Sequence, residues 1–370
     1  MEIIDVETLL RSDRLPVIDV RSPGEFGHGH IPGADNVPLF GDAERAEIGT
    51  LYKQVGSRPA VNRGLEIAGV KAERLVESVK AIASKSAFAI HCWRGGMRSE
   101  GFAWLCQDCG LKPQVLGGGY KSFRRAAQQC FAEPRRVVVL AGHTGAGKTK
   151  LLGALRDQGQ QVIDLEGLAN HRGSAFGGIG QPTQPTVEQF ENLLFLQWRT
   201  LDQTRPVWIE GESRSIGRVQ IPQAVWDQMS DAPMIFAEVD REQRVDFLVR
   251  EYGDFPADQL SLAIQRIRKR LGGARLQAAL DAIDRGDVRT VAACVLEYYD
   301  KSYSQSLRKR GSGNVLKFPL SRPGSADAAA KLIQLGADLT SKLEIADRAI
   351  VPANVELCRK ESPTSFMFRI

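Results

Sequence analysis

The chain has 370 residues, of which 43% are hydrophobic and 25% are charged, so its composition excludes a disordered protein and leaves room for two domains. The net charge of +5 permits a polyanionic partner but does not require one. No apolar run is long enough for a membrane span, and the acidic amino-terminal residues do not form a signal peptide. Six irregularly spaced cysteines are typical of a cytoplasmic protein with reduced thiols.

Two segments of the chain alternate short apolar strands with helices, which is the pattern of α/β domains. In the first segment, strands are expected at 15–20, 88–92 and 113–118, and helices at 71–83 and 99–110. In the second, a helix is expected at 148–159 and strands at 136–142, 161–165, 206–212 and 232–240. A polar segment at 132–136 contains a proline and is the expected linker.

The remaining sequence is mainly helical. One helix is expected to start at Thr186, because Thr186 and Gln189 have capping-box spacing. From about Arg241 to about Arg310 the pattern is helical and basic, and a short strand at 314–320 and one more helix complete the predicted fold.

The stretch HCWRGGMRS, from His91 to Ser99, places a cysteine at the end of a strand and a glycine-rich loop before a helix. In such a turn, backbone N–H groups point at one centre and the helix adds its positive end, which lowers the pKa of a thiol. Cys92 is therefore the candidate nucleophile, and Arg98 the candidate ligand of two oxyanion oxygens. An inert cysteine buried at a strand end is the alternative. The other residues expected around the anion are Trp93, Arg94, Gly95, Gly96, Met97 and Ser99.

The stretch VIDVRSPGEFGHGHIPGADNVPL resembles the amino-terminal signature of rhodanese domains, whose cysteine carries sulfur or selenium as a persulfide or perselenide. The resemblance implies that four residues support the active-site loop, namely Asp19, Arg21, Glu25 and His30. Many single-domain rhodaneses have one residue fewer between cysteine and arginine, whereas His-Cys-x5-Arg-Ser is also the phosphatase signature. The wider loop suits a phosphate-sized ligand, so phosphate hydrolysis and use of a phosphate-linked chalcogen donor both stay open.

A second anion site is indicated by GHTGAGKT, which fits G-x-x-x-x-G-K-[ST] between an expected strand and helix. Backbone N–H groups of such a loop surround a di- or triphosphate, Lys148 neutralises its charge, and Thr149 is a candidate ligand for Mg²⁺. The motif does not decide whether the diphosphate belongs to a nucleotide. The predicted diphosphate-binding residues are Gly142, Gly145, Gly147, Lys148 and Thr149.

Two later stretches, DLEGLANHRGSAFGG and EGESRSIG, follow parallel strands and are expected to face the same crevice. A carboxylate there would take the acidic role opposite a phosphate loop, and the other polar residues would contact a substrate. The alternative is that these side chains cap helices or are simply solvated. The candidates are Glu166, His171, Arg172, Ser174, Glu210, Glu212 and Arg214.

Taken together, HCWRGGMRSEGFAWL, LGGGYKSFRR, LAGHTGAGKT, DLEGLANHRGSAFG and WIEGESRSIG resemble the tRNA 2-selenouridine synthase family. In this family a rhodanese domain precedes a P-loop domain. We therefore predict an α/β fold with a rhodanese-like domain at 1–131 and a P-loop NTPase-like parallel-sheet domain, including a helical, basic part, at 136–320. A carboxyl-terminal helix and tail at 321–370 would pack on or extend the second domain.

The resemblance also implies an activity and its ligands. Family members convert 2-thiouridine at the wobble position of tRNAs of the Lys, Glu and Gln type to 2-selenouridine. Selenophosphate donates the selenium, and geranyl diphosphate provides an S-geranylated intermediate. We expect selenophosphate at the Cys92 loop and geranyl diphosphate at the P-loop, with no tightly bound cofactor and no metal other than Mg²⁺ at Thr149. The enzyme that makes selenophosphate is a further expected partner, and no membrane is involved.

Clustered basic residues are the expected contacts with the tRNA backbone, although such clusters also form solvated helix faces or lids over phosphates. They are Arg266, Arg268, Lys269, Arg270, Arg308, Lys309 and Arg310. Cys106 and Cys109 form a C-x-x-C without a second pair, so packing of Cys106 in the core is expected rather than a zinc site.

Three other functions stay open. A cysteine-dependent phosphatase coupled to a nucleotide-binding domain fits the thiol loop, but an obvious general-acid aspartate is missing. An ATP-dependent tRNA sulfurtransferase usually carries a Ser-Gly-Gly-x-Asp-Ser loop, which this sequence lacks. A non-enzymatic RNA-binding or nucleotide-switch protein with a vestigial rhodanese domain would not need both Cys92 and Arg98.

Overall fold

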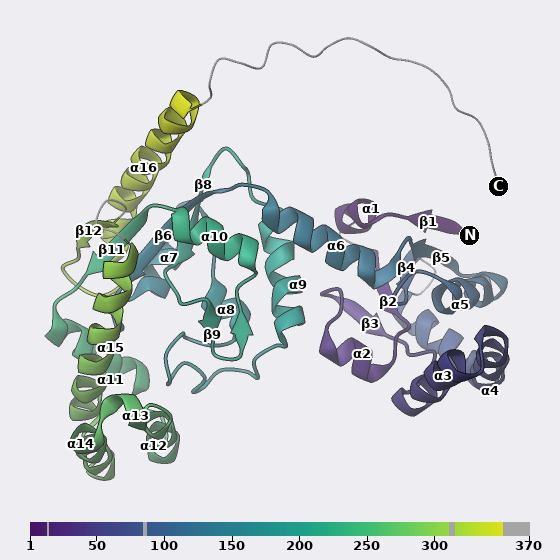
Figure 1. The fold of residues 1–370 in the computed structure, drawn as a ribbon, viewed down its shortest axis with the longest axis horizontal. Coiled ribbons are helices and arrows are strands. Elements are labelled where there is room, and N and C mark those ends of the chain that lie inside the picture. The colour runs from purple at the N-terminus through teal and green to yellow at the C-terminus, as the bar shows by residue number, and fades with distance from the viewer. Residues whose placement is uncertain (13–14, 84–86, 311–314, 351–370) are drawn as a thin grey trace.

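The computed structural model describes residues 1–12, 15–83, 87–310 and 315–350, apart from the side chains of residues 302, 304–310 and 342–350. Two parallel five-stranded sheets with helices around them lie side by side (Figure 1). The prediction of two tandem α/β units is therefore confirmed. Within the described residues, no helix is long and apolar enough to cross a membrane.

The first sheet has the strand order β1-β5-β4-β2-β3, with every neighbouring pair parallel. Its central strands are short apolar runs buried by the covering helices, which is why the sequence pattern identifies them. The strands are β1 (Glu2–Ile4), β2 (Val17–Asp19), β3 (Ala34–Asn36), β4 (Ala87–His91) and β5 (Lys112–Leu116). The helices are α1 (Val6–Arg11), α2 (Pro23–His28), α3 (Asp42–Gln54), α4 (Ser57–Ala83), α5 (Met97–Asp108) and α6 (Gly119–Ala132).

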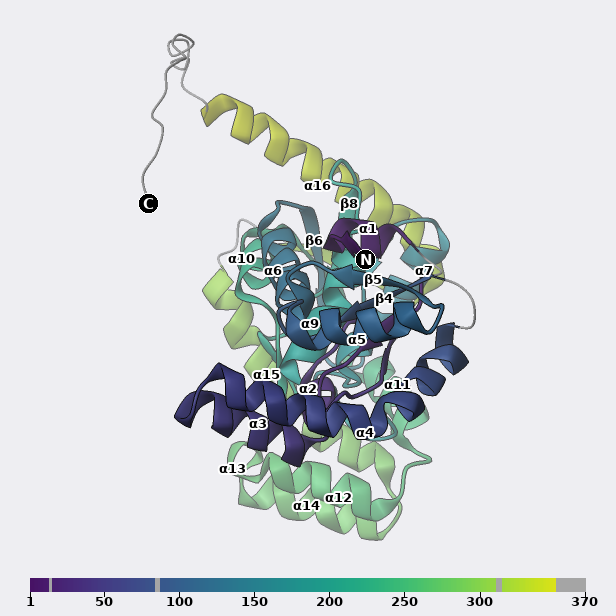
Figure 2. The same cartoon turned by 90° about the vertical axis from the view of Figure 1, so that its right-hand side faces the viewer.

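The helix expected at 71–83 is only the last part of α4, which starts at Ser57. Before residue 71 the buried positions of α4 are Ala60, Gly64 and Ile67. Their spacing is helical, but two of the three side chains are too small to give an apolar signal. Helix α4 forms a hairpin with α3 and also contacts α5, and the hairpin lies across one side of the sheet (Figure 2).

The second sheet has the order β12-β11-β6-β8-β7, again with parallel neighbours. Its central strands are fully buried, as the continuous apolar runs predict. The strands are β6 (Arg136–Gly142), β7 (Gln161–Ile163), β8 (Pro206–Glu210), β11 (Met234–Glu238) and β12 (Val315–Pro319), and a small hairpin pairs β9 (Ser215–Ile216) with β10 (Val219–Gln220). The helices beside it are α7 (Lys148–Asp157), α8 (Leu165–Ala169), α9 (Val187–Trp198) and α10 (Gln223–Asp231).

The segment from Arg241 to Arg310 is helical as predicted, but the basic stretch at 265–275 is not one continuous helix. It breaks at Ile267 and again at Gly272, whose φ of +84° lies in the left-handed region. The helices are α11 (Arg241–Tyr252), α12 (Ala257–Arg266), α13 (Arg268–Leu271), α14 (Gly273–Asp284) and α15 (Val288–Arg310).

The carboxyl-terminal helix α16 (Ala329–Ile350) follows a short 3-10 turn, η2 (Ala326–Ala328), and contacts α7, β6 and β8. Gly336 allows this close approach, because a Cβ there would lie 2.5 Å from the Trp208 ring. The first part of α16 therefore packs on the second sheet. Residues 351–370 of the predicted tail lie outside the described residues.

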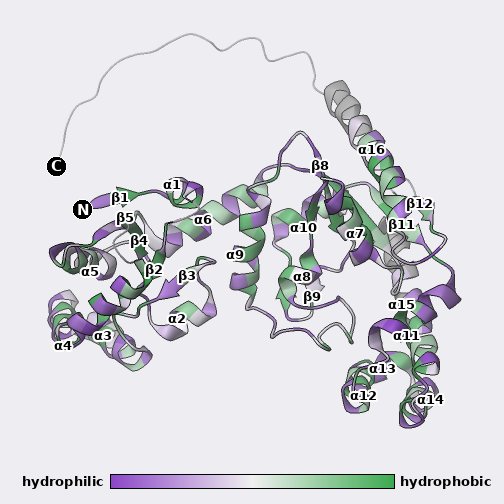
Figure 3. Ribbon diagram, turned by 180° about the vertical axis from the view of Figure 1, so that it is seen from behind, coloured by the Kyte–Doolittle hydropathy of each residue, from purple (hydrophilic) through white to green (hydrophobic). Residues whose placement is uncertain are grey.

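Helices α6 and α9 join the two halves through one hydrophobic core (Figures 1 and 3). Its largest buried side chains at this interface include Phe123, Phe131, Phe195 and Trp198. Hydrogen bonds fix how α6 and α9 are oriented, since the Tyr120 hydroxyl donates to Glu188 at 2.9 Å and accepts from Asn192 at 2.7 Å. Asn192 also donates to the carbonyl of His30, so the loop expected to support the thiol site also touches the second half.

Candidate active sites

The thiol loop begins where β4 ends and runs into α5, as the sequence predicts. Cys92 is almost completely buried, with 3% of its surface exposed. The glycine run 117–119 packs directly beneath the loop. A Cβ at Gly119 would lie 2.4 Å from both the Cys92 carbonyl oxygen and the Gly95 nitrogen, so only glycine fits there. The Tyr120 N–H donates to the Cys92 carbonyl at 2.9 Å, which fixes the loop on α6.

Hydrogen-bond donors converge on the Cys92 sulfur. The buried Ser99 hydroxyl lies 3.3 Å from Sγ and 3.1 Å from the Gly96 carbonyl oxygen. Burial alone would raise the pKa of Cys92, but Ser99, the backbone N–H of Arg94 and the charge of Arg98 outweigh it and lower the pKa below its ordinary value. The arrangement therefore favours the thiolate, the nucleophilic form.

Above the sulfur, an open pocket of about 600 Å³ is lined by Glu25, Arg45, Cys92, Trp93, Arg94, Gly96, Met97 and Arg98. Arg98 donates to Glu25 at 3.0 Å, and Arg45 lies 3.7 Å from the same carboxylate. Burial opposes ionisation of Glu25, but the two arginines and the Ser22 N–H lower its pKa. Glu25 therefore belongs to the pocket itself, beyond the supporting role that the sequence indicates.

Asp19 and Arg21 lie behind the loop as a fully buried ion pair, with 2.6 Å between Arg21 Nη2 and Asp19 Oδ2. Arg21 also donates to the Gly29 carbonyl at 2.7 Å and stacks 3.9 Å above the Tyr120 ring. These contacts link β2, the loop before β3 and α6, which is the supporting role predicted for both residues.

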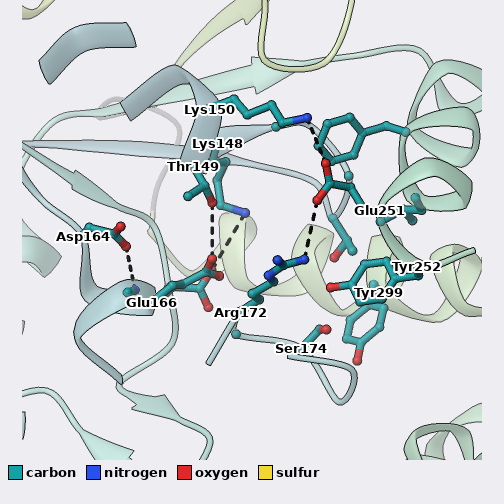
Figure 4. A pocket seen from close by; sticks show the side chains of 18 of the residues that line it. Lys148, Thr149, Lys150, Asp164, Glu166, Arg172, Ser174, Glu251, Tyr252 and Tyr299 are labelled. Atoms are coloured by element: carbon teal, nitrogen blue, oxygen red, sulfur yellow. Dashed lines mark hydrogen bonds and ion pairs between the residues drawn. The ribbon is translucent and has the colours of Figure 1, made fainter. Parts of the chain in front are cut away.

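The P-loop connects β6 to α7, and Figure 4 shows its lysine facing a cavity of about 420 Å³. Gly145 and Gly147 have φ values of +82° and +78°. A Cβ at Gly147 would lie 2.4 Å from the Gly324 nitrogen, because the segment after β12 packs onto the loop. Lys148 Nζ lies 3.5 Å from the Gly142 carbonyl oxygen and 3.9 Å from Glu212 Oε1.

Three glutamates meet beside Lys148. The Glu166 N–H donates to Glu210 at 2.5 Å, and the Glu166 carboxylate accepts from the Thr149 hydroxyl at 3.4 Å. Burial and then the neighbouring charge of Glu212 raise the pKa of Glu166 to about 8, and burial and then the charge of Glu166 raise the pKa of Glu210. Burial would lower the pKa of Lys148, but Tyr303 and the glutamates outweigh it and raise the pKa.

This donor set fits Mg²⁺, which prefers hard oxygen ligands. Burial and then the neighbouring carboxylates raise the pKa values of Glu166 and Glu210, and a bound cation would favour their ionised forms. Among the described residues, no three His, Cys, Asp or Glu side chains are arranged so that they could hold a metal ion by themselves. A bound Mg²⁺ would therefore be held by the Thr149 hydroxyl and Glu166, together with phosphate oxygens.

Sequence reasoning missed one wall of the cavity, which comes from α11 and α15. Tyr252, Tyr299 and Tyr303 line it, with Phe247, Leu248 and Glu251. Tyr303 donates to the Gly211 carbonyl at 2.7 Å, and Lys148 Nζ lies 5.9 Å from its ring centre. Glu251 holds Lys150 at 2.9 Å and Arg172 at 3.5 Å (Figure 4). The i, i+4 spacing of Tyr299 and Tyr303 is the signal that marks a shared helix face.

The other predicted site residues divide by position. Glu166, Arg172, Ser174 and Glu212 line the cavity, whereas Glu210 is buried behind Glu166. His171 and Arg214 do not line it: His171 packs against Gly177, and Arg214 is exposed. Arg266, Arg268, Lys269 and Arg270 are exposed, and the side chains of Arg308, Lys309 and Arg310 lie outside the described residues. Cys106 is completely buried in the hydrophobic core of the amino-terminal half.

Each half of the chain, with its candidate site, matches a known protein family. Residues 4–126 match the model of the rhodanese-like domain, and residues 135–318 match that of the tRNA 2-selenouridine synthase AAA domain. The tRNA 2-selenouridine synthase of Hahella chejuensis is 38% identical over 331 residues, covering 80% of this chain and 86% of that protein. The chain belongs to the tRNA 2-selenouridine synthase family. The family synthases of Chromohalobacter salexigens and Marinobacter nauticus are 38% and 33% identical and cover 80% and 82% of this chain, and 88% and 90% of their own lengths.

Proposed function

We propose that this protein converts 2-thiouridine at the tRNA wobble position to 2-selenouridine in two steps. The P-loop cavity uses geranyl diphosphate to geranylate the sulfur, and the Cys92 loop uses selenophosphate to replace the geranylated sulfur with selenium. One observation carries the proposal: a member of this family has two separate pockets suited to an anion, one built around a thiol and one around a P-loop, on a shared hydrophobic core.

The first step needs a leaving diphosphate. The thiouridine sulfur attacks the C1 carbon of geranyl diphosphate, the C1–O bond breaks, and the electron pair leaves with the diphosphate. Lys148 and the backbone N–H groups of 142–149 would stabilise the charge that develops on those oxygens. Mg²⁺ held by Thr149 and Glu166 would add positive charge there.

The tyrosine wall fits the organic part of that substrate. An allylic carbon gains positive charge as its diphosphate departs, and aromatic faces attract cations. Tyr252, Tyr299 and Tyr303 all line the cavity that holds Lys148. A nucleotide would also place a diphosphate on the P-loop, but the proposed reaction does not require one.

The second step needs a bound selenium donor. Selenophosphate is a tetrahedral anion, and the five residues between Cys92 and Arg98 form a loop wide enough for a phosphate-sized ligand. We assign Cys92 as the thiolate that acts on the donor and Arg98 as the ligand of its oxygens. The Cys92 thiolate would attack the phosphorus, so that the P–Se bond breaks with its electron pair on selenium. The released selenide would attack C2 of the base and expel geranyl thiolate, and water would then cleave the S–P bond on Cys92 to release phosphate.

The structure weighs against the phosphatase alternative. A phosphatase acid must protonate the leaving oxygen. The carboxylate that lines the thiol pocket is Glu25, and Arg98 with Arg45 keeps it ionised by lowering its pKa. Glu25 is therefore poorly suited to donate a proton. As a carboxylate it is suited to act as a base that activates water, or to hold Arg98 in position.

The tRNA surface is assigned on charge. Exposed Arg266, Arg268, Lys269 and Arg270 would contact the phosphate backbone of tRNAs of the Lys, Glu and Gln type. The enzyme that produces selenophosphate would deliver the donor, and we propose a cytoplasmic location for the reaction.

Nucleoside mass spectrometry tests the function. Thiolated tRNA is incubated with the protein and with geranyl diphosphate, selenophosphate or both. We expect geranylthiouridine with geranyl diphosphate alone and selenouridine with both. Unmodified 2-thiouridine in all three reactions, together with hydrolysis of an aryl phosphate by the same preparation, would favour the phosphatase instead.

A further inference from the structure

An apolar groove of about 430 Å³ lies between the α3–α4 hairpin and α5. Several large side chains along it are unusually exposed: Leu65 and Trp104 at 67%, Met97 at 66% and Tyr52 at 57%. Exposed apolar side chains scattered singly are ordinary, but a contiguous set lining a hollow marks a binding surface. The core of the first half already holds Phe102 and Leu75 beneath this groove, so its upper walls have no packing role of their own.

The groove is continuous with the thiol site. Met97 and Arg98 line both the groove and the pocket above Cys92. Among the described residues that line the groove, Arg98 is the only charged one, and it donates to Glu25 on the thiol side. A ligand in the groove can therefore end at the sulfur of Cys92 while the rest of it contacts only carbon-rich side chains.

We propose that this groove binds the geranyl chain of S-geranyl-2-thiouridine while its sulfur is replaced at the Cys92 site. This inference rests on the proposed function and adds a second apolar subsite to it. After the first step the diphosphate is gone, so nothing in the geranylated base is held by the P-loop. The ten-carbon chain is then the feature that distinguishes this base from an ordinary uridine.

The lining selects for such a chain. A peptide or an RNA strand would bring polar groups that lose their water without gaining partners along these walls. An isoprenoid chain has none, and its burial contributes favourably along its whole length. The groove is open along its side, so a chain attached to a bulky tRNA can enter laterally and leave again as geranyl thiol.

Two glycines allow the groove to be filled without disturbing the fold. Gly69 on α4 and Gly101 on α5 line it from facing helices, and a Cβ at either position would meet nothing within 4 Å. Leucine at these exposed helical positions also improves helix propensity. Gly27 on α2 has equally open space but does not line the groove, so Gly27→Leu is the matched control.

The test measures selenation of two anticodon stem-loop RNAs, one with S-geranyl-2-thiouridine and one with S-methyl-2-thiouridine, at saturating selenophosphate. For the unmodified protein and for Gly27→Leu, we expect the KM for the geranyl RNA to be lower than the KM for the methyl RNA by roughly 10-fold or more. Gly69→Leu and Gly101→Leu should lose most of that preference while their rates with the methyl RNA stay unchanged.

Other outcomes separate the two ideas. A preference for the geranyl RNA that survives in both leucine variants would overturn the groove assignment and leave the proposed function intact. Equal losses with both RNAs would also overturn it, because the groove would then only position the thiol loop. Failure of the unmodified protein to selenate either RNA would reject the proposed function itself.

Discussion

Replacing Ser99 with alanine tests how the fold activates Cys92. The Ser99 hydroxyl is the side-chain donor nearest the sulfur, at 3.3 Å, and both groups are buried. A hydrogen bond to a charged group contributes about 1.5–3 kcal/mol, and one pKa unit corresponds to about 1.4 kcal/mol. Ser99→Ala should therefore raise the pKa of Cys92 by about one to two units.

The direction of the pKa shift of Cys92 determines how the reactivity of its thiolate should change. Because the shift is upward, the thiolate fraction at any pH well below both midpoints falls by roughly 10- to 100-fold. Alkylation with iodoacetamide across a pH series, followed by mass spectrometry of the Cys92 peptide, gives the pKa as the midpoint of the rate profile. Cys106 is an internal control, because burial raises its pKa to about 12 and it should react slowly in both proteins.

An unchanged midpoint for Cys92 in Ser99→Ala would refute the reasoning. It would mean that the backbone N–H groups and Arg98 stabilise the thiolate without the hydroxyl. Arg98→Lys separates these contributions, since it keeps a positive charge but loses the guanidinium group that donates to Glu25. We expect the midpoint to move less in Arg98→Lys than in Ser99→Ala.

Three further predictions follow from other parts of the molecule. Burial and a neighbouring carboxylate raise the pKa of Glu166 to about 8, so its favourable contribution to stability is present at lower pH and lost as pH rises through about 8. The Tm of the unmodified protein should fall over this pH range, and Glu166→Gln should make that fall smaller. Identical profiles of Tm against pH for the two proteins would contradict the raised pKa of Glu166. Tyr120→Phe should cost about 1–3 kcal/mol in urea unfolding, because it removes the hydroxyl that donates to Glu188 and accepts from buried Asn192, whereas Tyr52→Phe at the surface should have little effect. Arg268→Glu with Arg270→Glu should weaken tRNA binding and reduce its salt dependence, and an unchanged salt slope would remove α13 from the interface.

The two candidate anion-binding loops were predictable because each is a contiguous motif. HCWRGGMRS and GHTGAGKT contain within nine residues the glycines, the charged group and the strand–helix context that an anion site needs. The helix that starts after Thr186 was equally local, since the Thr186 side chain accepts from the Gln189 N–H as the spacing predicts. Local chemistry of this kind survives whatever the rest of the chain does.

What the sequence could not predict depends on packing between distant segments. Tyr252 and Tyr303 reach the P-loop cavity from helices far along the chain, and no local pattern shows which face of those helices turns inward. Glu25 is similar, because its contact with Arg98 forms only when α2 and α5 meet. Leu65 lies on α4 and Trp104 on α5, and only the packing of the α3–α4 hairpin beside α5 places them along one groove.

The central claim is that two sites on one core carry out two successive steps. The most direct measurement uses two variants in sequence. Thiolated tRNA is first treated with Cys92→Ser and geranyl diphosphate, then purified and given to Lys148→Ala with selenophosphate, and its nucleosides are measured by mass spectrometry after each stage. We predict geranylthiouridine after the first stage and selenouridine after the second. Absence of geranylthiouridine with Cys92→Ser, or of selenouridine with Lys148→Ala, would contradict the division of labour between the thiol loop and the P-loop.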